Sequence, residues 1–235
     1  GIDAGEPEVR SKQVHENDWA EAWKRYFKPT RVTPTLTVKP TWEPYQAADE
    51  EKVIELDPGM AFGTGTHATT VLSLQLLEKY VDVQAEVIDV GTGSGILSIA
   101  CALLGASRVL AVDLDPVAVS SARANAELNG LSERITVAES GLLGVLRQED
   151  ALASSGLEAQ HPVPVKLPVQ VVVANILAEI LLRFVDDVAK ALEPGGIYIA
   201  SGIIRAKAAE VETALIRHGF AIIERREQED WIALA

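Results

Sequence analysis

Three glycines alternate with small hydroxyl residues directly after a run of β-branched residues, in the stretch VIDVGTGSGILSIA at residues 87–100. The β-branched residues suit a buried parallel strand, whereas Gly91, Gly93 and Gly95 allow a tight turn whose bare backbone a ligand can approach. Ser94 is placed to cap the helix that follows. The stretch therefore predicts a cofactor-binding turn between a strand and a helix.

A carboxylate follows the next strand at a distance from the turn that is typical of nucleoside binding. The strand pattern at residues 108–112 ends in Asp113, roughly 20 residues after Gly91. In a β-α-β unit this spacing brings a carboxylate to the ribose of a ligand lying over the glycine turn, so Asp113 is predicted to accept from both ribose hydroxyls. Asp115, which precedes Pro116, is predicted to cap the next helix instead.

The spacing of the glycines separates two kinds of nucleotide-like ligand. A dinucleotide fingerprint has the form G-x-G-x-x-G, because a pyrophosphate lies on the helix N-terminus. The sequence here is GTGSG, which suits a ligand without phosphate whose nearest charged groups are an amino acid carboxylate and ammonium. We therefore predict S-adenosylmethionine as the cofactor, with a nicotinamide dinucleotide as the alternative.

A second glycine-rich segment, DPGMAFGTGTHATT at residues 57–70, leads into an amphipathic helix. Gly63 and Gly65 allow a ligand to approach the backbone, and hydroxyl and imidazole groups follow at the helix N-terminus, where carboxylates bind favourably. An ordinary capped helix is the alternative interpretation. Two glycine loops within about 30 residues favour a ligand-binding role.

Two further strand patterns end in polar residues. Asn175 follows the apolar run at residues 169–174, at the sheet edge where open α/β folds bind ligands; it could instead cap the following helix. A short strand at residues 135–137 leads to Glu139 and Ser140, which are predicted to lie near the base of the ligand. The alternation of strands and helices predicts a doubly wound open sheet.

Several flanking elements are also predicted from local patterns. They are a helix from Asn17 to Pro29, strands at residues 33–38 and 52–56, a helix over residues 177–184, a turn at LEPGG (residues 192–196), a helix face from Ile204 to Leu215, and final strands at residues 221–224 and 231–234. Residues 150–168 lose periodicity and are interpreted as a surface insertion.

Charge argues against a nucleic-acid-binding protein. Lys and Arg number 21 against 34 Asp and Glu, which gives a formal net charge of −13. This sign opposes binding by counterion release, so a basic protein partner is expected rather than nucleic acid, although acidity that only keeps the protein soluble is the alternative. No apolar window of about 18 residues and no signal peptide is found, which predicts a soluble, cytoplasmic protein without membrane contact.

Neither cysteine chemistry nor a metal site is expected. Cys101 lies in the apolar pattern IACALLGA and is predicted to be a buried thiol rather than a nucleophile. The histidines at positions 15, 67, 161 and 218 are scattered along the chain. Their spacing matches no metal-ligand pattern.

The motifs together resemble those of the PrmA family, methyltransferases that act on ribosomal protein eleven of the large subunit. The resemblance runs from about Asn17 to the C-terminus and rests on DPGMAFGTGTHATT, DVGTGSGILSIA, AVDLDPVAV, NAELNG, VVVANILAEI, LEPGG and SGI. It implies a class I S-adenosylmethionine-dependent methyltransferase: an α/β, Rossmann-like, doubly wound sheet of seven mostly parallel strands with a short N-terminal helix and strand extension. We expect a linker and helix at residues 1–30 and the catalytic domain at 31–235.

The resemblance also implies site residues and a substrate. Cofactor contacts are expected at Thr64, Gly65, Thr66, Thr70, Asp89, Gly91, Gly93, Asp113, Leu114, Ser140 and Asn175. The family trimethylates lysine side chains and an α-amino group, and the predicted partner is a basic protein of the large ribosomal subunit, bound by a monomer. By this resemblance, the sequence is expected to begin near the interdomain linker, without the family's N-terminal substrate-recognition domain, and the 150–168 insertion is longer than expected.

Catalysis by this chemistry needs placement more than a strong base. The sulfonium leaving group already activates the methyl, so the enzyme must align a neutral amine with it. The Asn175 side-chain oxygen and the Ile176 carbonyl are predicted to orient that amine, and His67 is the only candidate proton relay, with a loop-fixing role as its alternative. An amino-methyltransferase acting on RNA or DNA and a nicotinamide-dependent oxidoreductase are the competing functions.

Overall fold

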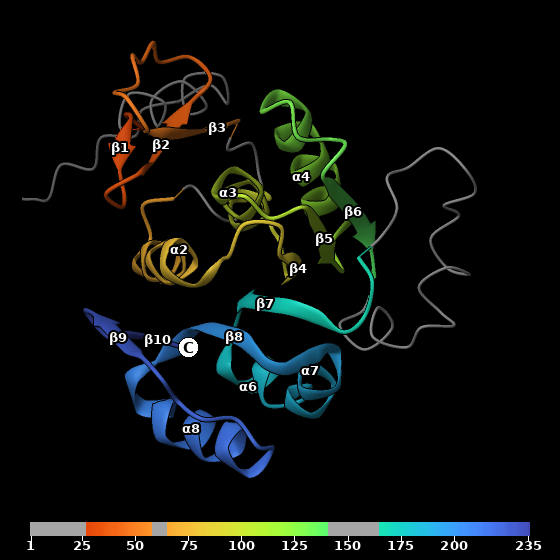
Figure 1. Cartoon of the computed structure of the whole chain (residues 1–235). Coiled ribbons are helices and arrows are strands. Elements are labelled where there is room, and N and C mark those ends of the chain that lie inside the picture. Colours follow the sequence, from red (N-terminus) through yellow and green to blue (C-terminus); the bar gives the residue numbers. More distant parts are fainter. Residues whose placement is uncertain (1–26, 58–64, 141–164) are drawn as a thin grey trace, which may run out of the picture.

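The computed structural model describes residues 27–57, 65–140 and 165–235 (Figure 1). The helix predicted to start at Asn17 lies almost entirely outside the described residues. So do Thr64 and most of the 150–168 insertion.

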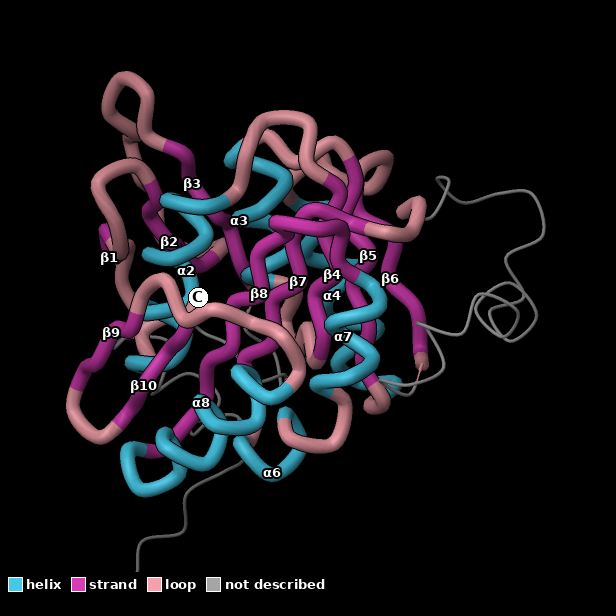
Figure 2. Tube along the Cα trace, turned by 60° about the horizontal axis from the view of Figure 1, so that its bottom comes forward, coloured by secondary structure: helices cyan, strands magenta, loops and turns pink. Residues whose placement is uncertain are grey.

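A twisted seven-stranded sheet forms the centre of the described chain (Figure 2). Its order is β6-β5-β4-β7-β8-β10-β9, and β4 to β8 are parallel while β10 runs antiparallel to both β8 and β9. The strands are β4 (Glu86–Val90), β5 (Arg108–Asp113), β6 (Ile135–Glu139), β7 (Val169–Asn175), β8 (Leu192–Ile204), β9 (Arg225–Gln228) and β10 (Trp231–Leu234). The predicted doubly wound, mostly parallel sheet of seven strands is confirmed.

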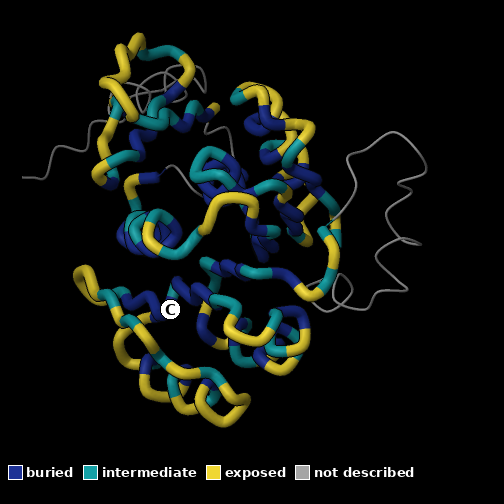
Figure 3. The backbone as a smooth tube through the Cα atoms, in the orientation of Figure 1, coloured by how far each residue is buried: buried dark blue, intermediate teal, exposed yellow. Residues whose placement is uncertain are grey.

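Helices cover both faces of this sheet, so its central strands are buried on both sides. One apolar cluster joins the sheet to α2 (Ala68–Tyr80), α3 (Ile96–Leu104) and α4 (Pro116–Leu128). The other joins it to α6 (Ala178–Leu181), α7 (Val185–Ala191) and α8 (Ala208–Arg217). Buried residues run through the central strands, whereas exposed residues lie on the outer turns of helices such as α4 and α8 and in loops such as residues 44–50 (Figure 3). This two-sided burial explains why the strands read as continuous apolar runs.

A small second sheet precedes α2. It has the order β1-β2-β3, made of β1 (Thr30–Arg31), β2 (Leu36–Pro40) and β3 (Lys52–Leu56). Leu36 and Ile54 are fully buried in the apolar cluster shared with α2 and α3. The strand predicted at residues 33–38 begins only at Leu36, because the Thr33 hydroxyl accepts from the Leu36 amide (2.9 Å) and makes a turn there.

Three other local predictions were wrong in their boundaries. LEPGG lies inside β8 rather than before it: Val169 pairs with Leu192 and Val171 with Ile197, so residues 193–196 oppose Gln170 alone and the turn interrupts the strand. The strand predicted at residues 221–224 is β9 at Arg225–Gln228, because the turn before Trp231 fixes the register. The helix predicted over residues 177–184 is only the four-residue α6, and a separate helix, α7, begins after it at Val185.

Candidate active site

The glycine turn joins β4 to α3 and lies against the end of β5. The Gly91 and Thr92 amides both donate to the Val112 carbonyl, at 2.9 and 3.0 Å. Gly91 (φ +71°), Gly93 (φ +55°) and Gly95 (φ +84°) all have left-handed backbone, which residues with a Cβ adopt at a cost of about 1 kcal/mol. The three glycines therefore allow the tight turn that the sequence pattern predicts.

The predicted helix cap at Ser94 was wrong. Helix α3 is capped by the backbone of Gly95 with no side-chain hydrogen bond, and Ser94 is fully buried. A Cβ at Gly95 would lie 3.1 Å from the Cα of Ala122 on α4. Close packing of α3 against α4 therefore determines how the helix begins.

Asp113 closes the turn from the neighbouring strand. Its Oδ2 accepts from the Gly93 amide (2.9 Å) and its Oδ1 accepts from the Asp115 amide (3.0 Å). A carboxylate has about four acceptor positions, so two more hydrogen bonds can be accepted here. Asp115 caps α4 by accepting from the Val117 amide (2.8 Å), as the sequence predicts.

Two more predicted residues lie beside Asp113. The Ser140 amide donates to the Asp113 carbonyl (3.0 Å), which places the end of β6 next to the end of β5. Leu114 is 66 % exposed. An exposed leucine thus directly follows the carboxylate at this edge of the sheet.

Asp89 lies beneath the turn, one residue before the end of β4. Its side chain is fully buried, and its Oδ2 accepts from the hydroxyls of Thr92 (2.7 Å) and Ser98 (2.6 Å), while Oδ1 has no partner within the described chain. Burial raises the pKa of Asp89 to about 6, although both hydroxyls act in the opposite direction. The Asp89 carboxylate thus ties the strand to the turn and to the first turn of α3.

Asn175 and Thr70 meet at the carboxyl end of β7. The Asn175 amide nitrogen lies 3.4 Å from the Thr70 hydroxyl oxygen, in the first turn of α2. The buried Ser201 hydroxyl donates to the Thr69 carbonyl (3.0 Å) and ties the same turn to β8. Asn175 does not cap a helix, since α6 begins after Leu177. The structure therefore brings the threonine-rich segment and Asn175 together.

Ile176 is held between two glycines. A Cβ on Gly91 would lie 2.5 Å from the Cγ2 of Ile176, and a Cβ on Gly202 would lie 2.4 Å from its carbonyl oxygen. The Ile176 amide donates to the Ser201 carbonyl (3.2 Å). The backbone after Asn175 therefore passes between the glycine turn and β8 with no room for side chains on either side.

His67 caps α2. Its Nδ1 accepts from the Thr69 amide (3.3 Å) and lies 2.9 Å from the Thr69 hydroxyl. Its ring meets that of Trp231 on β10 edge-on, with 5.3 Å between centroids. Gly65 has left-handed backbone (φ +87°), and a Cβ there would lie 3.0 Å from Val38. Gly65, Thr66 and His67 are consecutive, so these three predicted residues directly precede α2.

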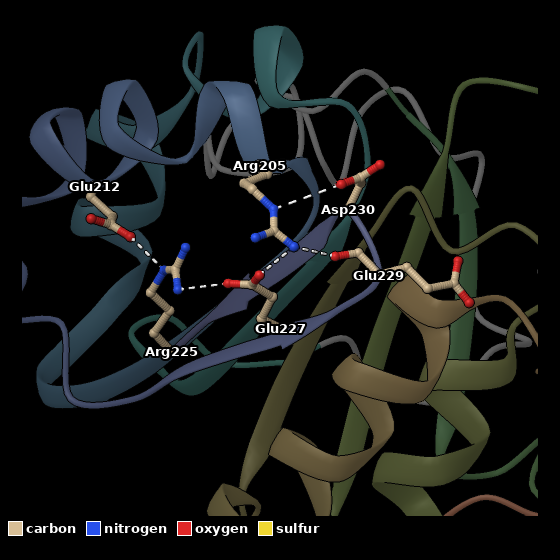
Figure 4. A network of polar contacts seen from close by, with 6 residues as sticks. All are labelled: Arg205, Glu212, Arg225, Glu227, Glu229 and Asp230. Carbon is tan, nitrogen blue, oxygen red and sulfur yellow. Dashed lines mark hydrogen bonds and ion pairs between the residues drawn. The ribbon is translucent and has the colours of Figure 1, made fainter.

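An ion-pair network holds the β9–β10 hairpin that carries Trp231 (Figure 4). The Arg205 side chain contacts the Glu229 carbonyl (2.6 Å), the Glu227 carboxylate (2.5 Å) and, at 3.7 Å, Asp230. Arg225 pairs with Glu227 (2.9 Å) and with Glu212 of α8 (3.2 Å). Exposed pairs contribute little stability individually. Their effect here is to set where the hairpin lies beside α8.

Sequence reasoning missed Thr92, Ser98, Ser201 and Trp231. Thr92 lies between two of the glycines and Ser98 follows them closely, so two hydroxyl residues near Asp89 in the sequence were a usable signal. Trp231 lies far from His67 in sequence, and no local pattern indicates that contact.

The described residues show no metal cluster, no exposed thiol and no helix that could span a membrane. No group of three or more His, Cys, Asp or Glu side chains in them is placed to bind a metal. Cys101 is buried, as predicted, and burial raises the pKa of its thiol well above the ordinary range. None of the described helices has the length and apolar character needed to cross a bilayer.

The strand order, with β10 antiparallel beside β8, and a glycine turn facing a carboxylate on the next strand define the Rossmann-like methyltransferase class. Solved structures agree: the crystal structure of ribosomal protein L11 methylase from Lactobacillus delbrueckii subsp. bulgaricus is 34 % identical, has a TM-score of 0.74, and covers 88 % of this chain and 97 % of its own. A putative methyltransferase complexed with SAH, 11 % identical over 72 % of this chain and 49 % of its own, shares the fold (TM-score 0.57).

Sequence comparison identifies the family. The family model described as "Ribosomal protein L11 methyltransferase (PrmA)" matches residues 2–235. Enzymes of that name from Brevibacillus brevis and Geobacillus kaustophilus are each 50 % identical to this chain, over 100 % and 99 % of it, and the matches span 69 % of each relative. The chain belongs to the PrmA family, which confirms the predicted family, fold and enzyme class over the oxidoreductase and nucleic-acid alternatives.

Proposed function

We propose that this chain transfers methyl groups from S-adenosylmethionine to amino groups of ribosomal protein L11. The observation that carries the proposal is the meeting of four segments at one edge of the sheet. The glycine turn after β4 bonds to Asp113 at the end of β5, and Asn175 at the end of β7 reaches the start of α2. This is the edge at which open α/β sheets bind ligands.

The chemistry of this edge fits a nucleoside without phosphates. The Asp113 carboxylate already accepts from Gly93 and retains acceptor positions for two ribose hydroxyls. Next to it, the exposed Leu114 side chain offers an apolar face for the base. In the turn itself, from Gly91 to Gly95, side chains are threonine, serine or absent, and no cation is available to hold a pyrophosphate.

Within this scheme the predicted cofactor contacts take distinct roles. We assign ribose binding to Asp113, close backbone approach to Gly91 and Gly93, contact with the base to Leu114 and Ser140, and contact with the methionine end to Thr64, Gly65, Thr66, Thr70 and Asn175. Asp89 acts indirectly in this proposal, because its buried carboxylate reaches the turn through Thr92 and Ser98.

Placement of the amine falls to Asn175 and Ile176. S-adenosylmethionine, when bound, supplies a methyl on a sulfonium that needs no acid to depart. Lysine has an ordinary pKa near 10.4, so the enzyme must favour the scarce neutral amine, and partial desolvation does so. Asn175 turns its amide nitrogen toward Thr70, and we assign its oxygen, with the Ile176 carbonyl, to accept from the amine and orient its lone pair.

His67 is assigned a structural role in this proposal. Its Nδ1 is engaged with Thr69 at the start of α2, which is how a helix cap behaves. A proton relay would need an imidazole nitrogen within hydrogen-bond reach of the amine. The proposal therefore contains no dedicated general base.

Label transfer tests the substrate, and calorimetry tests the cofactor. The full-length protein is incubated with methyl-labelled S-adenosylmethionine and unmodified ribosomal proteins with rRNA, and label is expected in L11; label in RNA would refute the substrate. S-adenosylhomocysteine is expected to bind the chain while NAD does not, and Asp113→Ala is expected to weaken that binding by roughly tenfold or more. Preferential binding of NAD would overturn the cofactor.

A further inference from the structure

The motif NAELNG on α4 has no role in the chemistry described so far. Its two asparagines, Asn125 and Asn129, are four residues apart and lie on the same side of α4, toward β3. Four residues of helix rise about 6 Å, and two residues of strand advance about 6.6 Å. Two such side chains can therefore pair with alternate residues of a strand edge.

Both asparagines do pair with the outer edge of β3. Asn129 accepts from the Glu55 amide (2.9 Å) and donates to the Glu55 carbonyl (2.7 Å). Asn125 accepts from the Asp57 amide (2.9 Å) and donates to the Asp57 carbonyl (3.4 Å). The two amides thus continue the small sheet where it would otherwise end in an unpaired edge.

Asn125 makes one contact that Asn129 does not. Its amide nitrogen also donates to the carbonyl of Ser94, in the middle of the glycine turn, at 2.9 Å. Asn125 is 1 % exposed and Ser94 is fully buried, so this bond is shielded from water. Only this orientation of the amide avoids placing its oxygen against the two carbonyls.

The surrounding packing makes this contact rigid. Ala122 lies one helical turn before Asn125 and packs closely against Gly95. A Cβ added to Gly95 would lie only 3.2 Å from the Cβ of Ala122. At the other end, the Gly93 amide is bonded to Asp113. Loss of the Asn125 donor would remove this hydrogen bond from the buried Ser94 carbonyl, and Ser94 lies between Gly93 and Gly95, which shape the cofactor turn.

We propose that Asn125 is a positioning residue that fixes the glycine turn through the Ser94 carbonyl and joins it to the end of β3, directly before the glycine-threonine segment of the sequence. Asn129 pairs with Glu55 and also donates to the Asn125 backbone carbonyl (2.7 Å), and none of its hydrogen bonds reaches the glycine turn. The inference rests on the proposed function, because its consequence is affinity for the cofactor. It predicts that two similar asparagines on one helix have different effects on that affinity.

The test compares matched substitutions in the full chain. Asn125→Asp keeps the acceptor for the Asp57 amide and Asn129→Asp keeps the acceptor for the Glu55 amide, and each substitution loses the donor. Binding of S-adenosylhomocysteine is measured by calorimetry at pH 8, with melting temperature beside it. We expect Asn125→Asp to weaken binding by roughly tenfold or more and to raise the KM for S-adenosylmethionine but not for L11, whereas Asn129→Asp binds within about twofold of wild type.

The outcomes are separable. If both substitutions weaken S-adenosylhomocysteine binding equally, attachment of β3 explains the loss and the role of the Ser94 contact is overturned. If neither substitution weakens binding, the proposal is overturned as well. Wild-type protein that does not bind S-adenosylhomocysteine would refute the proposed function itself. Should Asn125→Asp not fold, Asn125→Ser against Asn129→Ser makes the same comparison, since one hydroxyl cannot span both the Asp57 and Ser94 partners.

Discussion

A single buried carboxylate illustrates how the site is built at the scale of the residue. Asp89 has no exposed surface, and only one of its oxygens is hydrogen-bonded in the described chain. Burying a charge in this way is unfavourable, and the two hydroxyl donors offset it only in part. The residue that organises the turn therefore carries a cost in stability that depends on pH.

The stability of Asp89→Asn relative to wild type should depend on pH. The pKa of Asp89 is raised from 3.8 to about 6 in the folded state, so the native protein binds the proton more tightly than the unfolded chain does. Wild-type stability then falls as pH rises from about 4 to about 6, by about 3 kcal/mol, and levels off above that. Asparagine retains an oxygen for Thr92 and Ser98 and does not ionise.

Chemical denaturation of both proteins at pH 4, 5, 6 and 7 measures the effect. Other titrating groups are common to the pair, so the difference in unfolding free energy isolates Asp89 and should move in favour of Asp89→Asn with rising pH. A difference that is constant across this range would show that Asp89 titrates as an ordinary carboxyl.

Residues that act through chain-local chemistry were predictable, and those that depend on packing were not. Asp113 follows from its distance to the glycines and Asp115 from the proline after it. Ser94 also had the residue type of a cap, yet close packing of Ala122 against Gly95 leaves α3 with a backbone cap. Spacing in the sequence reveals such local relations, but it does not reveal which residues of distant elements pack together.

At the scale of elements, three strand ends and the start of α2 meet around Ile176. Gly91, which follows β4, leaves room for the Ile176 side chain. Gly202, in β8, leaves room for the Ile176 backbone. The predicted Asn175 and Ile176 are thus placed by neighbours that a local pattern does not identify. Register explains the other errors, since β9 is located by its pairing with β10 rather than by its own apolar residues.

Substitution of Gly202 by alanine should abolish most of the activity. Its φ is +81°, and the new Cβ would lie 2.4 Å from the Ile176 carbonyl oxygen and 2.8–2.9 Å from other backbone atoms of Ile176. The backbone must move, and a displacement near 1 Å at a reacting group costs about 100-fold in rate. Gly219→Ala is the matched control, because Gly219 has φ +88° and nothing within 4 Å.

Methyl transfer to L11 and melting temperature are compared for the two variants. Both should lose stability from left-handed backbone, and only Gly202→Ala should lose about 100-fold in kcat. Similar kcat values for the two would show that the Ile176 backbone does not place the amine.

The start of α2 allows a helix cap to be distinguished from a general base. Asparagine at position 67 can cap the helix by accepting from the Thr69 amide as His67 does, but it cannot take a proton at neutral pH. His67→Asn should keep kcat within a few fold of wild type, while His67→Ala should also lose about 1 kcal/mol of stability. Removal of a general base costs about 10²–10⁴-fold, so a loss of that size in both variants would contradict the capping role.

At the scale of the whole molecule, the sequence predicts the architecture, but its net charge does not identify a binding partner. The architecture is predictable from the alternation of strands and helices, because parallel strands need crossover connections, which are usually helices that pack on the faces of the sheet. Net charge could not identify a partner, because −13 suits both a soluble protein and one that binds a basic substrate. The proposed substrate is predicted to be a basic ribosomal protein, which favours the second interpretation, and salt dependence tests it.

Methylation of L11 should weaken with ionic strength in a way that cofactor binding does not. An acidic enzyme attracts a basic protein over a distance of several ångströms, and the Debye length falls from about 10 Å at 0.1 M salt to 3 Å at 1 M. The kcat/KM for L11 should therefore fall by roughly tenfold between 50 and 500 mM NaCl, mainly through association. Binding of S-adenosylhomocysteine, whose net charge is small, should change by less than about twofold. Equal salt dependence of the two would attribute the effect to the enzyme's own stability, whereas a kcat/KM that is unaffected by salt would show that the excess of carboxylates is not used in recognition.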